Sequence, residues 1–150
     1  MRFRLLFPLA AAVLAAAAPA RAQFAKPEDA VRYRQGAFVV MAQHFSRIGA
    51  MANGRVPYDM KVAVENAELV AAMARLPWAG FAPATASLSQ RARPEIWAEQ
   101  ARFTEQNDKL AQEAARLLAA AKTNNLDNLK AAFGSTAAVC KSCHDAYRSH

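Results

Sequence analysis

Glycine, cysteine and long apolar runs are scarce in this chain of 150 residues. It has 5 glycines and 2 cysteines, and beyond residue 22 only 5 prolines stand against 29 alanines. This balance disfavours sheet and favours helix, because alanine loses no side-chain entropy in a helix whereas glycine and proline interrupt one. Beyond residue 22 no stretch approaches the roughly 20 apolar residues that a membrane span needs. The sequence therefore predicts helices and no membrane span.

The first 22 residues have the features of a secretory signal peptide. They begin with two arginines, continue with an apolar stretch over residues 5–18, and end in the small-x-small pattern of residues 20–22. We therefore expect a signal peptide over residues 1–22, a mature domain over residues 23–150, and a location in the periplasm.

Basic residues outnumber acidic ones, but they are not concentrated. The formal net charge is +7, and it falls to +4 when the leader is removed with its three arginines. The remaining Lys and Arg are scattered along the chain, which argues against nucleic-acid binding.

Proline, asparagine and aspartate divide the mature chain into four predicted helices. The first two cover about residues 27–52 and 58–76, with Asp59 as an N-cap. The third begins at Pro94-Glu95 and runs without a break to residues 123–124, and the fourth runs from Asn125 to near the C-terminus. A connection rich in Pro, Gly, Ala and Ser spans residues 77–93.

The apolar residues of the last two segments lie at helical spacing. The third segment repeats every seven positions, a period that keeps one stripe against neighbouring helices: Ile96, Phe103, Leu110 and Leu117. The fourth places a similar face at steps of three and four: Leu129, Phe133, Thr136, Cys140, Cys143 and Tyr147. With two of three connections short, we expect an all-α, antiparallel up-down-up-down four-helix bundle.

Residues 140–144 form a C-x-x-C-H motif, the attachment pattern of c-type haem. On a helix, Cys140 and Cys143 face the same way, so each sulfur can add to one haem vinyl group. His144 lies four residues after Cys140 and can place an imidazole nitrogen on the iron. Export agrees with this prediction, because bacteria complete c-type haem attachment outside the cytoplasm.

Three other interpretations of the cysteines are weaker. A disulfide suits an oxidising compartment, but cysteines three apart at the end of a helix are poorly placed to bridge. A structural zinc site needs four ligands, and beyond the cysteines the chain offers only His44, His144 and His150. A thioredoxin-like pair belongs to an α/β pattern, which is missing here.

A sixth iron ligand must come from upstream, because the motif ends near the C-terminus. In an antiparallel bundle the end of the last helix lies beside the start of the first. A rise of about 1.5 Å per residue then places His144 at the same height as the first helix near Arg34. Arg34, Gln35 and Phe38 are therefore candidates for the distal side, and none is a usual haem ligand. Met41 is the nearest thioether, although methionine at helical spacing is also ordinary core. We expect a five-coordinate iron with Phe38 walling its open face.

The mature chain resembles the cytochromes c′ over nearly its whole length. Five segments carry the resemblance: residues 23–30, 33–35, 76–78, 93–97 and 140–148. The position of C-x-x-C-H near the C-terminus of a helical chain, with these flanking segments, is more specific than the motif alone.

The resemblance implies a homodimer in which each chain carries one covalent haem c with His144 as axial ligand. It also implies haem contacts from Arg34 and Gln35, and a basic side chain, Arg148, near the proximal imidazole. Family members bind nitric oxide and often carbon monoxide. Many carry Leu where this chain has Phe38, and residues 84–92 depart from the family pattern.

Three functions follow from these residues. The first is reversible binding of nitric oxide or carbon monoxide at ferrous iron, with a role in protection against nitric oxide or in electron transfer. The second is electron transfer with a periplasmic redox partner at a six-coordinate, low-spin haem that uses Met41 or another ligand. The third, an enzyme, is disfavoured because the distal candidates include no His or carboxylate. Independently, apolar residues on more than one face of the first two helices favour a homodimer.

Overall fold

The computed structural model describes residues 23–149. The expected signal peptide, residues 1–22, lies outside the described residues. The four long helices are α1 (Pro27–Ala52), α2 (Met60–Met73), α4 (Gln100–Ala121) and α5 (Leu126–Tyr147). Between α2 and α4 lie two 3-10 helices and one short α-helix: η1 (Pro77–Gly80), η2 (Pro83–Leu88) and α3 (Glu95–Ala98).

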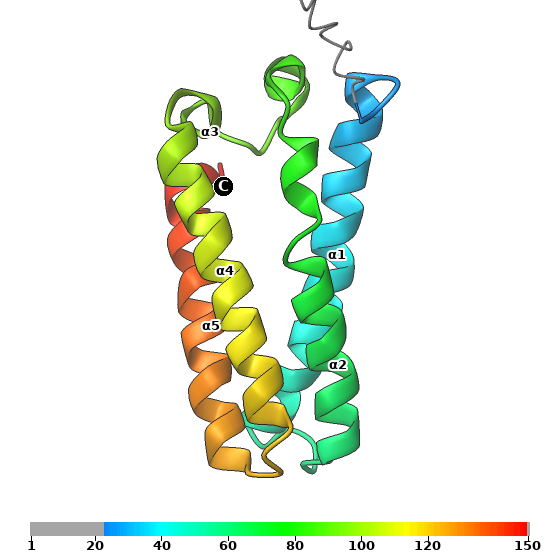
Figure 1. Cartoon of the computed structure of the whole chain (residues 1–150), viewed down its shortest axis with the longest axis vertical. Helices are drawn as coiled ribbons and strands as arrows, with labels where there is room; N and C mark the ends of the chain where they lie inside the picture. The colour runs from blue at the N-terminus through cyan, green and yellow to red at the C-terminus, as the bar shows by residue number, and fades with distance from the viewer. Residues whose placement is uncertain (1–22, 150) are drawn as a thin grey trace, which may run out of the picture.

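The long helices alternate in direction and form one bundle. In Figure 1, α1 runs down, α2 up, α4 down and α5 up, with α1 and α2 beside the pair α4 and α5. After α2, η1 continues upward beside α1, and η2 and α3 lie at the upper end, above the end of α5. This arrangement confirms the predicted all-α up-down-up-down bundle. Within residues 23–149, no helix is both long and apolar enough to cross a membrane.

Short-range capping sets the ends of the helices. The Asp59 carboxylate accepts a hydrogen bond from the Val62 amide at 3.0 Å and so begins α2. The Asn125 side chain accepts from two backbone amides, at 2.9 and 3.1 Å, and begins α5. Helix α1 ends at Asn53-Gly54, where Gly54 has a φ of +66°, a conformation that glycine adopts without strain. These boundaries agree with the prediction from sequence.

The core has two parts. The larger part contains the fully buried Ile48, Val70, Leu117 and Leu129 and joins all four long helices. The smaller part, at the upper end, contains Ile96, Phe103 and Tyr147. All four residues of the heptad stripe are buried, as predicted.

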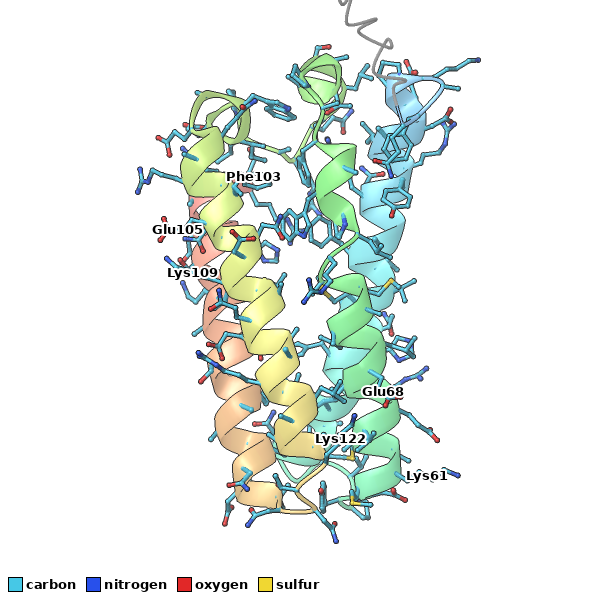
Figure 2. The ribbon with its side chains drawn as sticks, viewed as in Figure 1. Lys61, Glu68, Phe103, Glu105, Lys109 and Lys122 are labelled. Atoms are coloured by element: carbon cyan, nitrogen blue, oxygen red, sulfur yellow. The ribbon has the colours of Figure 1, made fainter. Side chains whose placement is uncertain are left out.

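Polar residues on α4 face away from this core. Figure 2 shows Phe103 directed inward from α4, with Glu105 and Lys109 on the outer face of the same helix. Glu105 and Lys109 form an ion pair at 2.8 Å, and Lys122 approaches Glu68 of α2 at 3.9 Å. The outer face of α4 is therefore solvated, and only its inner stripe packs.

The prediction of one unbroken third helix is wrong. The segment breaks at Glu99, whose φ of −115° and ψ of 45° are not helical. The Trp97 indole donates to the Phe81 and Ala82 carbonyls at 3.0 and 3.2 Å, and Ile96 is buried. These long-range contacts hold α3 against the 3-10 segment, so α3 does not continue into α4.

Candidate functional site

The C-x-x-C-H motif occupies the last turns of α5. Both cysteines are free thiols and are half-buried. Cys140 packs against the larger core part, which includes Met41, whereas Cys143 packs against the smaller part around Phe103 and Tyr147. Both cysteines therefore pack on the side of α5 that carries Leu129 and Tyr147, which is the face that helical spacing predicts.

Burial shifts the pKa values of the two thiols and the imidazole of the motif in the direction that favours their neutral forms. It raises the pKa of the Cys140 thiol, and it raises the pKa of Cys143 to about 11, with a smaller contribution from the neighbouring Cys140. Partial burial, together with the positive charge of Arg148, lowers the pKa of His144. A neutral imidazole is the form that binds a metal.

A cleft of about 470 Å³ opens beside the motif, between α1, α5 and the loop before α3. Its walls include Phe45 of α1, Arg91 of the loop, and Cys140, His144 and Arg148. Lys141 and Asp145 also line it and pair with one another at 2.5 Å. The cleft therefore combines the motif with the two arginines, a setting that suits an anionic group.

The chain after His144 is fixed to the loop before α3. The Arg93 amide donates to the Tyr147 carbonyl at 3.0 Å, and the Ser149 amide donates to the Arg91 carbonyl at 2.9 Å. Ala92 and Arg148 form an isolated antiparallel bridge between these two bonds. This backbone clasp, residues 91–93 with 147–149, holds Arg91 and Arg148 at the cleft.

Arg34 is buried deeply, with only 3% of its surface exposed. Its guanidinium carbon lies 4.2 Å from the centre of the Phe81 ring and 5.9 Å from that of Trp97. Among residues 23–149, no carboxylate accepts from it, and its buried Nη2 has no hydrogen-bond partner there. Burial lowers the pKa of Arg34, although a guanidinium remains charged in proteins. A buried cation with a free donor calls for an anion.

The structure separates the other predicted residues. Gln35 is exposed. The Phe38 ring is half-buried and lies edge-on to Trp78 and Phe81, at 5.8 and 6.3 Å between ring centres. Met41, with 7% exposure, belongs to the core part that Cys140 adjoins. Phe38 and Met41 are thus interior residues of α1, whereas Gln35 is not.

Of the three distal candidates on α1, none lines the cleft beside His144. The α1 residue that shares the cleft with His144 is Phe45, further along the helix. The count of helical rise matches His144 with Arg34 on the assumption that the helices end level, whereas α5 ends below the upper tip of α1 (Figure 1). Sequence analysis missed Phe45 for this reason. It also missed Arg91, which the atypical loop delivers to the cleft.

The other metal interpretation finds no support in the described part of the chain. Across residues 23–149, no group of three or more His, Cys, Asp or Glu side chains is placed to hold a metal ion. The free thiols likewise leave the disulfide interpretation without support.

A chain produced without haem attachment should show slow alkylation of Cys143. A thiol with a pKa of about 11, rather than 9.0, has about 100-fold less thiolate at pH 8, and the thiolate is the reactive species. We expect iodoacetamide to modify Cys143 about 100-fold more slowly in buffer than in urea. Trypsin cuts at Lys141, so mass spectrometry reads Cys140 separately as an internal comparison. Equal rates in buffer and urea would contradict the buried placement.

Comparison with known proteins gives one consistent result. Residues 29–148 match the family model described as Cytochrome C'. The chain is 47% identical over 126 residues to cytochrome c′ of Alcaligenes xylosoxydans xylosoxydans, which covers 84% of this chain and 98% of the relative. Cytochrome c′ of Rubrivivax gelatinosus is 44% identical over 127 residues, with 84% and 98% covered.

Solved structures agree. A crystal structure of the Rubrivivax gelatinosus cytochrome c′ superimposes with a TM-score of 0.81 at 44% identity, covering 85% of this chain and 100% of that one. A nitric oxide complex of a variant of cytochrome c prime from Alcaligenes xylosoxidans gives 0.80 at 45% identity, with the same coverage. The chain belongs to the cytochrome c′ family.

Proposed function

We propose that this chain is an exported cytochrome that binds nitric oxide or carbon monoxide at a five-coordinate haem iron. The observation that carries the proposal is the placement of C-x-x-C-H at the end of α5, with both free thiols toward the bundle interior. Members of the family carry covalently attached haem c. Cys140 and Cys143 are the proposed anchors, and His144 is the proposed axial ligand.

The polar residues around the interior suit a group with acidic substituents. Haem carries two propionates, and the free Nη2 of buried Arg34 offers a donor and a positive charge to one of them. Arg148 lines the cleft with His144 and supplies the basic side chain near the imidazole. Gln35 remains a candidate contact on the resemblance alone.

The open face of the iron is proposed to lie against Phe38. The residues that surround its ring include Trp78 and Phe81, and none of the three has a carboxylate or imidazole. Such a wall gives bound dioxygen no hydrogen bond from an acid or imidazole, so that ligand loses about 1.5–3 kcal/mol of stabilisation. Nitric oxide depends less on such a bond. The nitric oxide complex of the Alcaligenes xylosoxidans relative supports this choice of ligand.

The same wall favours a binding protein over an enzyme. Turnover of peroxide or nitric oxide usually needs a side chain that transfers protons at the reacting atoms. Phe38, Trp78 and Phe81 supply none.

Export and the redox partner rest on other residues. The signal-peptide pattern of residues 1–22 supports a periplasmic location. At the cleft, exposed Arg91, Lys141 and Arg148 surround the proposed axial ligand, so a redox partner in the periplasm with acidic residues on its surface fits best.

One observation favours an alternative, a six-coordinate electron-transfer haem. Met41 is buried in the core part that Cys140 adjoins, so a thioether lies in the same region of the interior as one anchor. Methionine is a known second axial ligand in c-type cytochromes.

The absorption spectrum of the reduced, haem-loaded protein separates the two. A five-coordinate, high-spin iron should give one broad visible envelope, and nitric oxide should change it by binding and by releasing His144. The control is the M41L variant, which leaves the spectrum unchanged if Met41 is only core. Sharp, split bands that M41L abolishes would establish the alternative instead.

Replacing Phe38 with alanine should accelerate carbon monoxide binding. The smaller side chain removes the wall over the open face, and a barrier lower by about 1.4 kcal/mol raises the association rate about tenfold. Stopped-flow mixing of the reduced protein with carbon monoxide measures the rate. The matched control is V39A, which shortens an exposed neighbour on α1 and should leave the rate unchanged. Equal rates for F38A and the parent would remove Phe38 from the proposed distal wall.

A homodimer through α1 and α2 is also proposed. Among residues 23–149, the large exposed hydrophobic residues lie on α1, on α2 and in the connections that follow these helices, and none lies on α4 or α5. Val39 is 61% exposed, and Val62 and Leu69 are each 40% exposed at a seven-residue spacing along α2. An apolar surface on α1, α2 and the connections that follow them favours a second copy as its partner.

The double variant V39E/L69E should convert the dimer to a monomer. Two carboxylates on each copy place like charges and unpaired polar groups in the proposed interface. Sedimentation equilibrium should report half the mass of the parent, with an unchanged haem spectrum. L88E adds a carboxylate at an equally exposed leucine of η2 and should leave the dimer intact. A parent protein that sediments as a monomer would end this proposal.

A further inference from the structure

The buried guanidinium of Arg34 is held from one side only. Its Nη1 donates to the Gly80 carbonyl at 2.5 Å and to the Thr85 hydroxyl at 2.8 Å. Its Nη2 is equally buried and has no acceptor in the part of the chain that the structure describes. The two terminal nitrogens of one planar group therefore differ, since one is fully engaged and the other is free.

Thr85 is placed for this contact. It is fully buried, and it is the one buried residue of η2. Its hydroxyl lies 2.7 Å from the Ala82 carbonyl and donates its single proton there, so its lone pairs face the guanidinium. A buried position with this much contact would normally hold an apolar side chain. The threonine instead supplies an acceptor whose direction is fixed.

Gly80 brings the second acceptor into reach. A Cβ at this position would lie 2.6 Å from the Ala30 carbonyl oxygen and 2.8 Å from the Cβ of Arg34. The backbone of η1 therefore rests directly on α1, at a distance that only glycine allows without a shift. This close approach sets the carbonyl against Nη1.

Aromatic rings flank the plane of the guanidinium. Phe81 covers one face at 4.2 Å, and Trp97 lies at 5.9 Å. Trp97 is itself fixed by the bonds from its indole to the backbone of residues 81–82. With Nη1 tied and the plane stacked, the guanidinium has little freedom to rotate.

We propose that Thr85 and the Gly80 carbonyl are positioning groups that fix the Arg34 guanidinium so that its free Nη2 is presented to a haem propionate. The inference rests on the proposed function, because it requires the haem. It assigns residues 80–85, a segment outside the C-x-x-C-H helix, to the electrostatic environment of the iron. A fixed cation beside the propionate offsets its negative charge and so favours the reduced iron.

The test is the midpoint potential of the haem-loaded protein at pH 7, measured by optical redox titration. R34Q removes the cation, and we expect the equilibrium to shift about tenfold toward the oxidised form, which is about 59 mV for one electron. T85V removes the hydroxyl while keeping the shape, and T85A removes it with less bulk. Both should shift the potential in the same direction as R34Q and by less.

Three controls separate positioning from stability. T85S keeps a hydroxyl and should retain the parent potential. S87A deletes an exposed hydroxyl of the same 3-10 helix and should also retain the parent potential. L117A removes a fully buried side chain of α4 that has no part in the contacts of Arg34. It should lower the unfolding temperature without moving the potential. A role for Thr85 in folding alone predicts that T85V behaves like L117A.

The outcomes are distinct. A shifted potential in R34Q and in T85V or T85A, with T85S unchanged, supports the proposal. A shift in R34Q alone overturns the role of Thr85, and no shift in any variant overturns the whole inference. Failure of both T85V and T85A to load haem also overturns it, since Thr85 would then serve assembly. A parent protein without covalent haem refutes the proposed function itself.

Discussion

The last turns of α5 both pack in the bundle and carry the C-x-x-C-H motif, and the neighbouring elements are arranged around these turns. The helix packs as one member of a bundle, and the same inward face carries two thiols that adjoin different parts of the core. Cys140 and Cys143 take positions that apolar side chains would otherwise fill. These two positions adjoin the larger and the smaller parts of the core, so a haem attached to both cysteines, as proposed, would contact both parts.

The elements that were predictable from sequence are those set by near neighbours. The caps at Asp59 and Asn125 act within three residues, and the glycine after Asn53 ends α1 through its own backbone preference. The heptad stripe is equally local within α4, where its period places Phe103, Leu110 and Leu117 on the inward face. In each case the residues that decide the structure lie within a few positions of one another.

The elements that were not predictable depend on contacts between distant segments. The break at Glu99 follows from the hydrogen bonds that the Trp97 indole donates to the Phe81 and Ala82 carbonyls. These two residues precede Trp97 by 16 and 15 positions in the sequence. Placing Phe45 in the cleft required the relative heights of α1 and α5, which no count of residues supplies. For Arg34 the sequence indicated a haem contact by resemblance. The burial of Arg34 and its contact with Thr85 depend on the packing of η2 against α1, because Thr85 follows Arg34 by 51 positions in the sequence.

The backbone clasp between residues 91–93 and 147–149 has a practical consequence for handling the protein. A tag fused after residue 150 would begin close in the sequence to Ser149, which lines the same cleft as His144. A polyhistidine tag placed there would bring competing imidazoles within reach of the proposed axial position and would strain the pairing of Ser149 with Arg91. A purification handle placed before residue 23 would be far in the sequence from every residue that lines this cleft.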